Sequence, residues 1–148
     1  MNIIIDIGGT NIRIRTSDNS YFFKNKHNAN SYTDLINIIE FHLKKIDNII
    51  NKIVIALPCV IHNYISYNTT NLKFLNNIIL QNTILKYNTV YFNDGDLSLL
   101  GEIEYNKINK NNNILSLIFG TGVGCGIWIN NNIIRNVEAN KIFEDYLG

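Results

Sequence analysis

Two glycine-rich turns, each placed between apolar strands, limit the folds that are open to this chain. The first turn, 8–10 (Gly-Gly-Thr), follows the apolar run 2–7 and precedes a stretch in which Ile and Arg alternate. The second turn, 120–126, carries glycine at every other position and follows the apolar run 114–119. Glycine at alternate positions weakens a strand, so we expect close backbone approach to a ligand there, not a packing requirement. Facing each other, the two turns would form a cradle for a polyphosphate.

Hydrophobic periodicity predicts strands alternating with helices along the rest of the chain. Ser31 is the expected cap of the first helix, and Asp96 a possible cap of the third. The expected strands cover 2–7, 11–16, 21–23, 52–57, 64–67, 90–92, 114–119, 125–129 and 133–134, and the expected helices cover 31–47, 75–86, 96–105 and a segment from 137. This alternation favours an α/β fold.

The composition bounds the functional class. With 148 residues, 46% apolar and 17% charged, the chain is long and apolar enough for a folded core, as one domain or one domain plus part of another. A net charge of +1 gives no basic stripe for nucleic acid. No apolar run approaches the ~20 residues that span a membrane, and the N-terminus lacks the basic region of a signal peptide, so we expect a cytoplasmic protein. Cys59 and Cys125 stand alone, which predicts buried free thiols and no zinc site.

The first turn carries groups suited to phosphate. Glycines let backbone N–H groups approach an anion and adopt positive φ, and Thr10 adds a hydroxyl donor. Asp6 ends the preceding strand and could hold Mg²⁺, directly or through water. The alternative is a tight hairpin with an acid at its corner. The segment is neither a P-loop, which needs Gly-Lys-Ser/Thr, nor a dinucleotide fingerprint, because a strand follows it where a helix should.

A second candidate is the Asn93-Asp94 pair, at the end of one strand and before a helix. Strand ends in α/β folds commonly present catalytic groups. A carboxylate there could accept the proton of a substrate hydroxyl as that hydroxyl attacks phosphorus. The alternative is an acid that caps the helix.

Three segments taken together resemble one family. Residues 6–11 (DIGGTN), 93–102 (NDGDLSLLGE) and 120–127 (GTGVGCGI) are similar to the corresponding segments of ROK-type sugar kinases, in the family's order. The run 53–58 (IVIALP) resembles a strand that this family shares with bacterial glucokinases. The resemblance spans nearly all of the chain. It implies an actin/hexokinase-like (ribonuclease H-like) first lobe over 1–112, and the opening β-hairpin of an incomplete second lobe over 113–148.

The resemblance also implies roles for single residues. Asp94 matches the general base, Asn93 and Asn71 match sugar contacts, and Glu144 resembles an acidic sugar ligand, although a solvated surface helix would explain Glu144 equally well. The expected ligands of phosphate and Mg²⁺ are Asp6, Gly8, Gly9, Thr10, Gly120, Thr121 and Gly122. The implied cofactors are ATP and Mg²⁺, and the implied substrate is a hexose or N-acylhexosamine.

The chain departs from the family pattern at several places. The family's Glu-x-Gly-His sugar segment and its Cys-rich zinc loop are absent, Cys59 replaces a usual Gly, and Asn11 stands where many members carry Lys. The histidines, His27, His42 and His62, are expected on the surface or on a helix face. The glycine segment expected to hold adenosine is missing.

Three functions are compatible with these features. The first is an ATP-dependent sugar kinase, which self-association into a homodimer could complete. The second is a non-catalytic remnant with a role in sugar binding or interaction. The third, a sugar-responsive repressor, is disfavoured because no helix-turn-helix precedes the first strand and the chain lacks a basic face.

Overall fold

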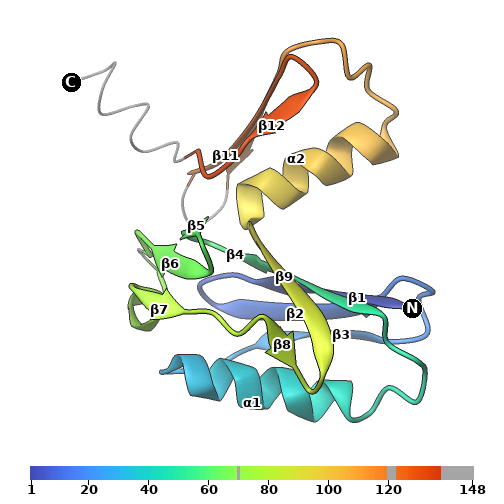
Figure 1. The fold of residues 1–148 in the computed structure, drawn as a ribbon, viewed down its shortest axis with the longest axis vertical. Helices are drawn as coiled ribbons and strands as arrows, with labels where there is room; N and C mark the ends of the chain where they lie inside the picture. Colours follow the sequence, from blue (N-terminus) through green and yellow to red (C-terminus); the bar gives the residue numbers. More distant parts are fainter. Residues whose placement is uncertain (70, 120–122, 138–148) are drawn as a thin grey trace. The chain divides into compact units, whose positions relative to one another are not determined.

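A computed structural model describes residues 1–69, 71–119 and 123–137 of this α/β chain. The chain divides into two units, 1–92 and 93–148. The expected domain boundary at 112 differs from this division, because the helix after Asn93 belongs to the second unit. In the first unit, a helix lies along one face of the main sheet (Figure 1). In the second unit, a helix packs against a three-stranded sheet.

The main sheet is built around the first strand of the chain. Its six strands, in spatial order, are β3 (Phe22–Lys26), β2 (Asn11–Thr16), β1 (Asn2–Ile7), β4 (Lys52–Leu57), β9 (Tyr87–Asn93) and β8 (Thr83–Ile84). β1 pairs antiparallel with β2 and parallel with β4. Alternate side chains point to opposite faces of a strand, so Ile12 and Ile14 are buried while Arg13 and Arg15 are exposed. The first expected hairpin is therefore confirmed, with the glycine turn at its tip.

Helix α1 (Tyr32–Leu43) covers the buried face of this sheet. The Ser31 side chain accepts a hydrogen bond from the Asp34 N–H at 3.0 Å, which confirms the expected cap. Leu35 and Ile39 are each 1% exposed, and burying such a side chain contributes about 1.5–3 kcal/mol. The helix ends four residues before the expected position of 47.

The helix expected over 75–86 is wrong. A 3₁₀ turn (Lys73–Leu75) leads into β7 (Ile78–Ile79), which joins β5 (Val60–His62) and β6 (Ile65–Tyr67) in a small antiparallel sheet. Backbone N–H groups that a helix would use internally go elsewhere: Asn77 donates to the Ser66 carbonyl at 2.7 Å. Leu85 and Lys86 have φ of 48° and 70°, which no right-handed helix allows.

The second unit begins with α2 (Asp94–Tyr105) and continues with β10 (Ile114–Phe119), β11 (Val123–Ile129) and β12 (Asn132–Ile134). These strands form one antiparallel sheet, which confirms the second expected hairpin. Its core consists of Leu99 and Ile103 from α2 and Trp128 from β11. The Trp128 indole N–H donates to the Lys110 carbonyl at 2.8 Å, so the segment before β10 is tied to this core.

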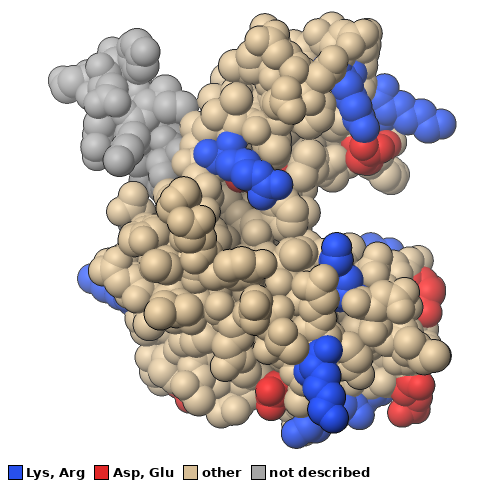
Figure 2. Space-filling model, viewed as in Figure 1, with Lys and Arg blue, Asp and Glu red and all other residues tan. Residues whose placement is uncertain are grey.

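Charged side chains are scattered over the face shown in Figure 2, where blue and red groups are separated by wide uncharged areas. Within the described ranges, no helix is long and apolar enough to cross a membrane.

Candidate functional site

The first glycine turn is held by a hydrogen bond within its hairpin and by a contact from a distant loop. The Gly8 N–H donates to the Asn11 carbonyl at 2.9 Å, within the hairpin. A Cβ added to Gly9 would lie 2.7 Å from the Cβ of Asn71, closer than two carbon atoms can approach, whereas a Cβ at Gly8 would meet nothing nearer than 3.7 Å. Neither glycine has a positive φ. Gly9 is thus required by a close approach of another loop, and the expected positive φ is not the reason.

The carboxylate of Asp6 forms an ion pair beside this turn. Arg13, directly across from Asp6 in the β1–β2 register, places its Nη1 2.7 Å from the Asp6 Oδ2. The side chains are 51% and 38% exposed for Arg13 and Asp6, so the pair adds little to stability. The ion pair does orient the Asp6 carboxylate. A cation that bound Asp6 would share this carboxylate with the Arg13 guanidinium.

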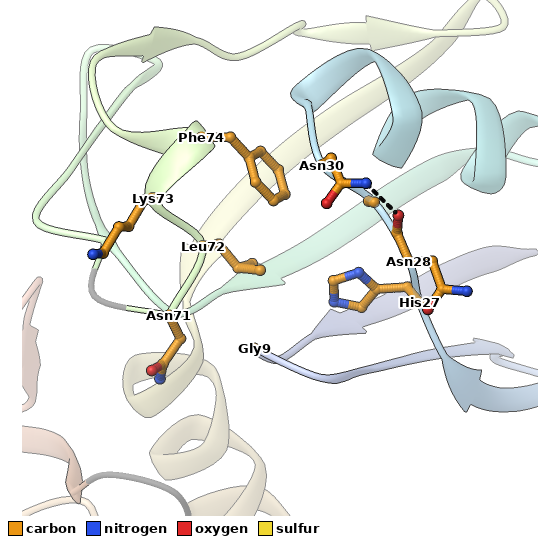
Figure 3. Close-up of a pocket in the computed structure, with 9 residues that line it drawn as sticks. Gly9, His27, Asn28, Asn30, Asn71, Leu72, Lys73 and Phe74 are labelled. Carbon is orange, nitrogen blue, oxygen red and sulfur yellow. Dashed lines mark hydrogen bonds between the residues drawn. The ribbon is translucent and has the colours of Figure 1, made fainter.

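A pocket of about 650 Å³ opens next to Gly9 within the first unit. Two loops form it, 27–30 after β3 and 71–74 between β6 and β7 (Figure 3). Leu72 and Phe74 point between the loops, whereas the side chains of Asn71 and Lys73 point outward. The structure therefore brings Asn71, an expected sugar contact, next to Gly9, an expected phosphate ligand.

His27 is a residue that the sequence interpretation missed. Its Nε2 lies 2.9 Å from the Gly8 carbonyl oxygen, and its backbone N–H donates to the Thr10 carbonyl at 3.0 Å. Its side chain is partly buried, not a surface group as expected. No local pattern signals this contact, because it joins residues 19 positions apart.

The Asn93-Asp94 pair lies at the junction of β9 and α2. The Asn93 Oδ1 accepts the N–H groups of Gly95 (2.9 Å) and Asp96 (3.2 Å), so Asn93 is the N-cap of the helix. Asp94 is then the first helical residue, half-buried, with its Oδ1 2.9 Å from the Gly95 N–H. The capping role that was an alternative for Asp94 is thus filled by its neighbour.

Asp96 is not the helix cap that its position suggested. Its side chain is buried, and its Oδ2 accepts the Asn136 N–H at 3.0 Å, which ties the segment after β12 to α2. Burial raises the pKa of Asp96, while the hydrogen bond from Asn136 and the charge of Arg135 oppose the shift. Burial and the nearby Asp96 also raise the pKa of the Cys125 thiol. Cys59 and Cys125 are both buried, as expected, and they do not form a disulfide with each other.

The second glycine turn has a packing role that its sequence pattern does not indicate. A Cβ at Gly126 would lie 2.7 Å from the Leu99 Cβ and 2.8 Å from the Gly95 carbonyl oxygen. A Cβ at Gly95 would lie 2.3 Å from the Cys125 carbonyl oxygen. The expectation that packing does not require these glycines is therefore wrong for Gly126, whose hydrogen lets the start of α2 lie directly on β11.

Several expected site residues lie outside the described ranges: Gly120, Thr121, Gly122 and Glu144. Asn93 and Asp94 belong to the second unit, and Asp6, Gly8, Gly9, Thr10 and Asn71 belong to the first. Among the described residues, no three His, Cys, Asp or Glu side chains gather as a metal site.

Comparison with solved structures confirms the fold. A Listeria monocytogenes protein described as an N-acetylmannosamine kinase superposes with a TM-score of 0.78 at 18% identity, over 91% of this chain and 49% of its own. A ROK family glucokinase from Streptomyces griseus, in complex with glucose and AMPPNP, superposes with a TM-score of 0.77 at 18% identity, over 92% of this chain and 46% of its own. A ROK family transcriptional regulator, a homolog of the E. coli MLC protein, superposes with a TM-score of 0.63 at 15% identity, over 89% of this chain and 37% of its own.

The chain thus spans about half the length of the two kinases that it resembles. These likenesses show the actin/hexokinase-like fold expected from the sequence. No curated protein matches the sequence. The ROK family model matches residues 2–140, which is most of the chain. The chain therefore belongs to the ROK family.

Proposed function

We propose that this chain forms the half of an ATP-dependent sugar kinase that carries the catalytic base and the first phosphate turn. The reaction transfers the γ-phosphate of ATP to a hydroxyl of a hexose or N-acylhexosamine. The observation that carries the proposal is the junction at Asn93, where a capping side chain fixes the start of α2 and thereby places the Asp94 carboxylate in its first turn. A helix N-terminus favours negative charge, which suits a carboxylate that must accept a proton.

The first turn supplies the groups that would bind phosphate. Within the described ranges, the N–H groups of Gly9 and Thr10 have no hydrogen-bond partner, and the turn carries the Thr10 hydroxyl as a further donor. These groups fit a phosphate, which backbone N–H groups bind well in concave turns. Asp6 is the carboxylate that fits Mg²⁺, since that ion usually takes one or two carboxylates plus phosphate oxygens. Bound Mg²⁺ would offset the negative charge of the phosphates.

Asp94 acts on the sugar. As the hydroxyl oxygen of the sugar forms its bond to the γ-phosphorus, the hydroxyl proton passes to the Asp94 carboxylate, and the bond from that phosphorus to the β–γ bridging oxygen breaks to release ADP. Asn93 lies beside it, with its Oδ1 engaged in the helix cap, and would orient the sugar through its amide nitrogen.

A coupled assay for ADP release tests the proposal over a panel of hexoses and N-acylhexosamines. We expect turnover on at least one sugar by the full chain, and a loss of about 10²–10⁴-fold in Asp94→Asn, the range ascribed to a positioned general base. Turnover that does not exceed the Asp94→Asn control on any sugar contradicts the proposal.

A second candidate function is sugar binding without catalysis, because the residues of this chain by themselves span about half of the kinases that it resembles. A cleft buries most of its ligand, so nucleotide affinity falls when one wall is missing. A non-catalytic sugar-binding protein would gain thermal stability with a sugar but none with Mg-ATP. Tight Mg-ATP binding by the purified chain would exclude this second function.

A further inference from the structure

His27 contacts the first glycine turn through two separate N–H groups. A carbonyl oxygen only accepts hydrogen bonds, so the imidazole Nε2 must carry the hydrogen that it donates to Gly8 across 2.9 Å. The backbone N–H of His27 donates to the Thr10 carbonyl across 3.0 Å. One residue directly after β3 therefore fixes the carbonyls on both sides of Gly9.

Fixing these carbonyls also fixes the N–H groups of the turn. In a trans peptide the C=O and N–H point in opposite directions, so the Gly9 N–H points away from the imidazole that holds the Gly8 carbonyl. The same reasoning directs the Asn11 N–H away from the His27 backbone. In a closed two-residue hairpin the Asn11 N–H would donate to the Gly8 carbonyl. Within the described ranges that bond is not formed, and His27 takes its place.

The surroundings of the imidazole limit how the turn can move. The ring lies at the wall of the pocket between the loops 27–30 and 71–74 (Figure 3). Its Nδ1 is buried and, among the described residues, has no hydrogen-bond partner. Asn71 packs on Gly9 from the other loop, so a shift of the turn to meet a differently oriented ring would collide with it. The turn is thus wedged between His27 and Asn71.

We propose that His27 is a positioning residue of the phosphate turn. Its imidazole holds the Gly8 carbonyl and so prevents the hairpin from closing on itself, which leaves the N–H groups of Gly9 and Asn11 directed at an anion. The inference rests on the proposed function only in naming phosphate as that anion. The clamp itself is a property of the unliganded turn.

Three variants separate the clamp from a general loss of structure. His27→Leu removes the donor at a similar size, and His27→Gln retains an amide donor of nearly the same reach. His62→Gln is the matched control, because His62 is an exposed histidine of the same unit. Mg-ATP affinity is measured by titration for each, together with the thermal shift caused by the sugar. We expect about a tenfold loss of Mg-ATP affinity in His27→Leu, as for a lost hydrogen bond of ~1.4 kcal/mol, and at most a threefold loss in His27→Gln. Equal affinity in His27→Leu and the wild type overturns the proposal.

A measurement without nucleotide keeps this inference distinct from the proposed function. Nitrogen-15 NMR of the unliganded chain should show His27 as the Nε2–H tautomer. The amide resonances of Gly9 and Asn11 should move in His27→Leu but not in His62→Gln. If the wild type binds no Mg-ATP while these shifts occur, the kinase proposal fails and the clamp stands. If His27→Leu does not fold, the tautomer of the wild type and the Mg-ATP affinity of His27→Gln test the clamp instead. An Nδ1–H tautomer, or amide resonances that His27→Leu leaves in place, refutes the clamp.

Discussion

The contact between α2 and β11 gives the sharpest stability prediction, through the substitution Gly126→Ala. The new methyl carbon would lie 2.7 Å from the Leu99 Cβ and 2.8 Å from the Gly95 carbonyl oxygen. Carbon atoms pack comfortably at about 3.5–4.0 Å, so the overlap is about 1 Å. Leu99 is 1% exposed and its Cβ is part of the helix frame, so it cannot rotate away. The helix must move, and overpacking of this kind costs about 1–3 kcal/mol, occasionally more.

Gly101→Ala is the matched control. Gly101 lies in the same helix, is exposed, and has nothing within 4 Å of an added Cβ. Replacing an exposed helical glycine with alanine should raise the free energy of unfolding by about 0.5–1 kcal/mol. The same chemical change, one methyl group, is thus expected to act in opposite directions at 126 and 101.

Urea unfolding followed by tryptophan fluorescence measures both effects. Trp128 is the only tryptophan of the chain and lies in the core that Leu99 helps to form, so its emission reports on the second unit. A loss of about 2 kcal/mol corresponds to a decrease in Tm of about 4–8 °C for a chain of this size. If Gly126→Ala unfolds at the same urea concentration as the wild type, the close packing of α2 on β11 is refuted.

Three further predictions concern the cap, the buried histidine and the first turn. Asn93→Ala removes the acceptor of two helix N–H groups and should lower the free energy of unfolding by about 1 kcal/mol, whereas Asn93→Asp keeps the cap and should affect sugar binding alone; urea unfolding and a sugar titration distinguish them. Burial, with a smaller contribution from Lys45, lowers the pKa of His42, whose Nδ1 lies 2.6 Å from the Tyr21 hydroxyl. As the pH falls, the His42 of the unfolded chain therefore binds its proton near pH 6.5, before the His42 of the folded chain does. The free energy of unfolding should decrease as the pH decreases from about 7 and level off below the folded pKa. Unfolding curves from pH 5 to 8 measure this, and equal stability across that range contradicts it. Gly9→Ala should displace the loop at Asn71 and weaken Mg-ATP binding, while Gly8→Ala, whose new Cβ would make only an ordinary van der Waals contact at 3.7 Å, should be tolerated. Comparable affinities in the two variants would count against the wedged turn.

The elements that the sequence predicts well are those whose burial is set by local alternation. In β2, Ile12 and Ile14 face the core while Arg13 and Arg15 face solvent, and this period of two is visible without knowledge of neighbouring strands. The Ser31 cap is equally local, since its partner is three residues away. Both hairpins and the first helix follow from such patterns.

The region 75–86 could not be predicted in this way, because distant partners decide it. Leu80 donates its N–H to the Tyr64 carbonyl, and the Ser66 hydroxyl donates to the Leu75 carbonyl. Apolar residues such as Leu75 and Leu80 are buried, which their spacing suggested, but by a sheet instead of a helix. Long-range hydrogen bonds thus override a helical pattern.

The candidate site was predictable only in part, because some of its contacts also join residues that are distant in the sequence. Asp94 and the first turn follow from motifs that are contiguous in sequence, and the structure adds how Asn93 and Asn71 hold them. His27 and the packing role of Gly126 depend on contacts across 19 and 27 positions, respectively. No window of neighbouring residues carries that information.

The central claim is that Asp94 serves as the base in phosphoryl transfer to a sugar. Single-turnover transfer of labelled γ-phosphate, with enzyme in excess over Mg-ATP, measures this step on the sugar that the panel identifies. We predict a labelled sugar phosphate with the wild type, and in Asp94→Asn a rate at least about a hundredfold lower with unchanged sugar affinity. Equal transfer rates in the two proteins, or no labelled sugar phosphate with the wild type, would contradict the claim.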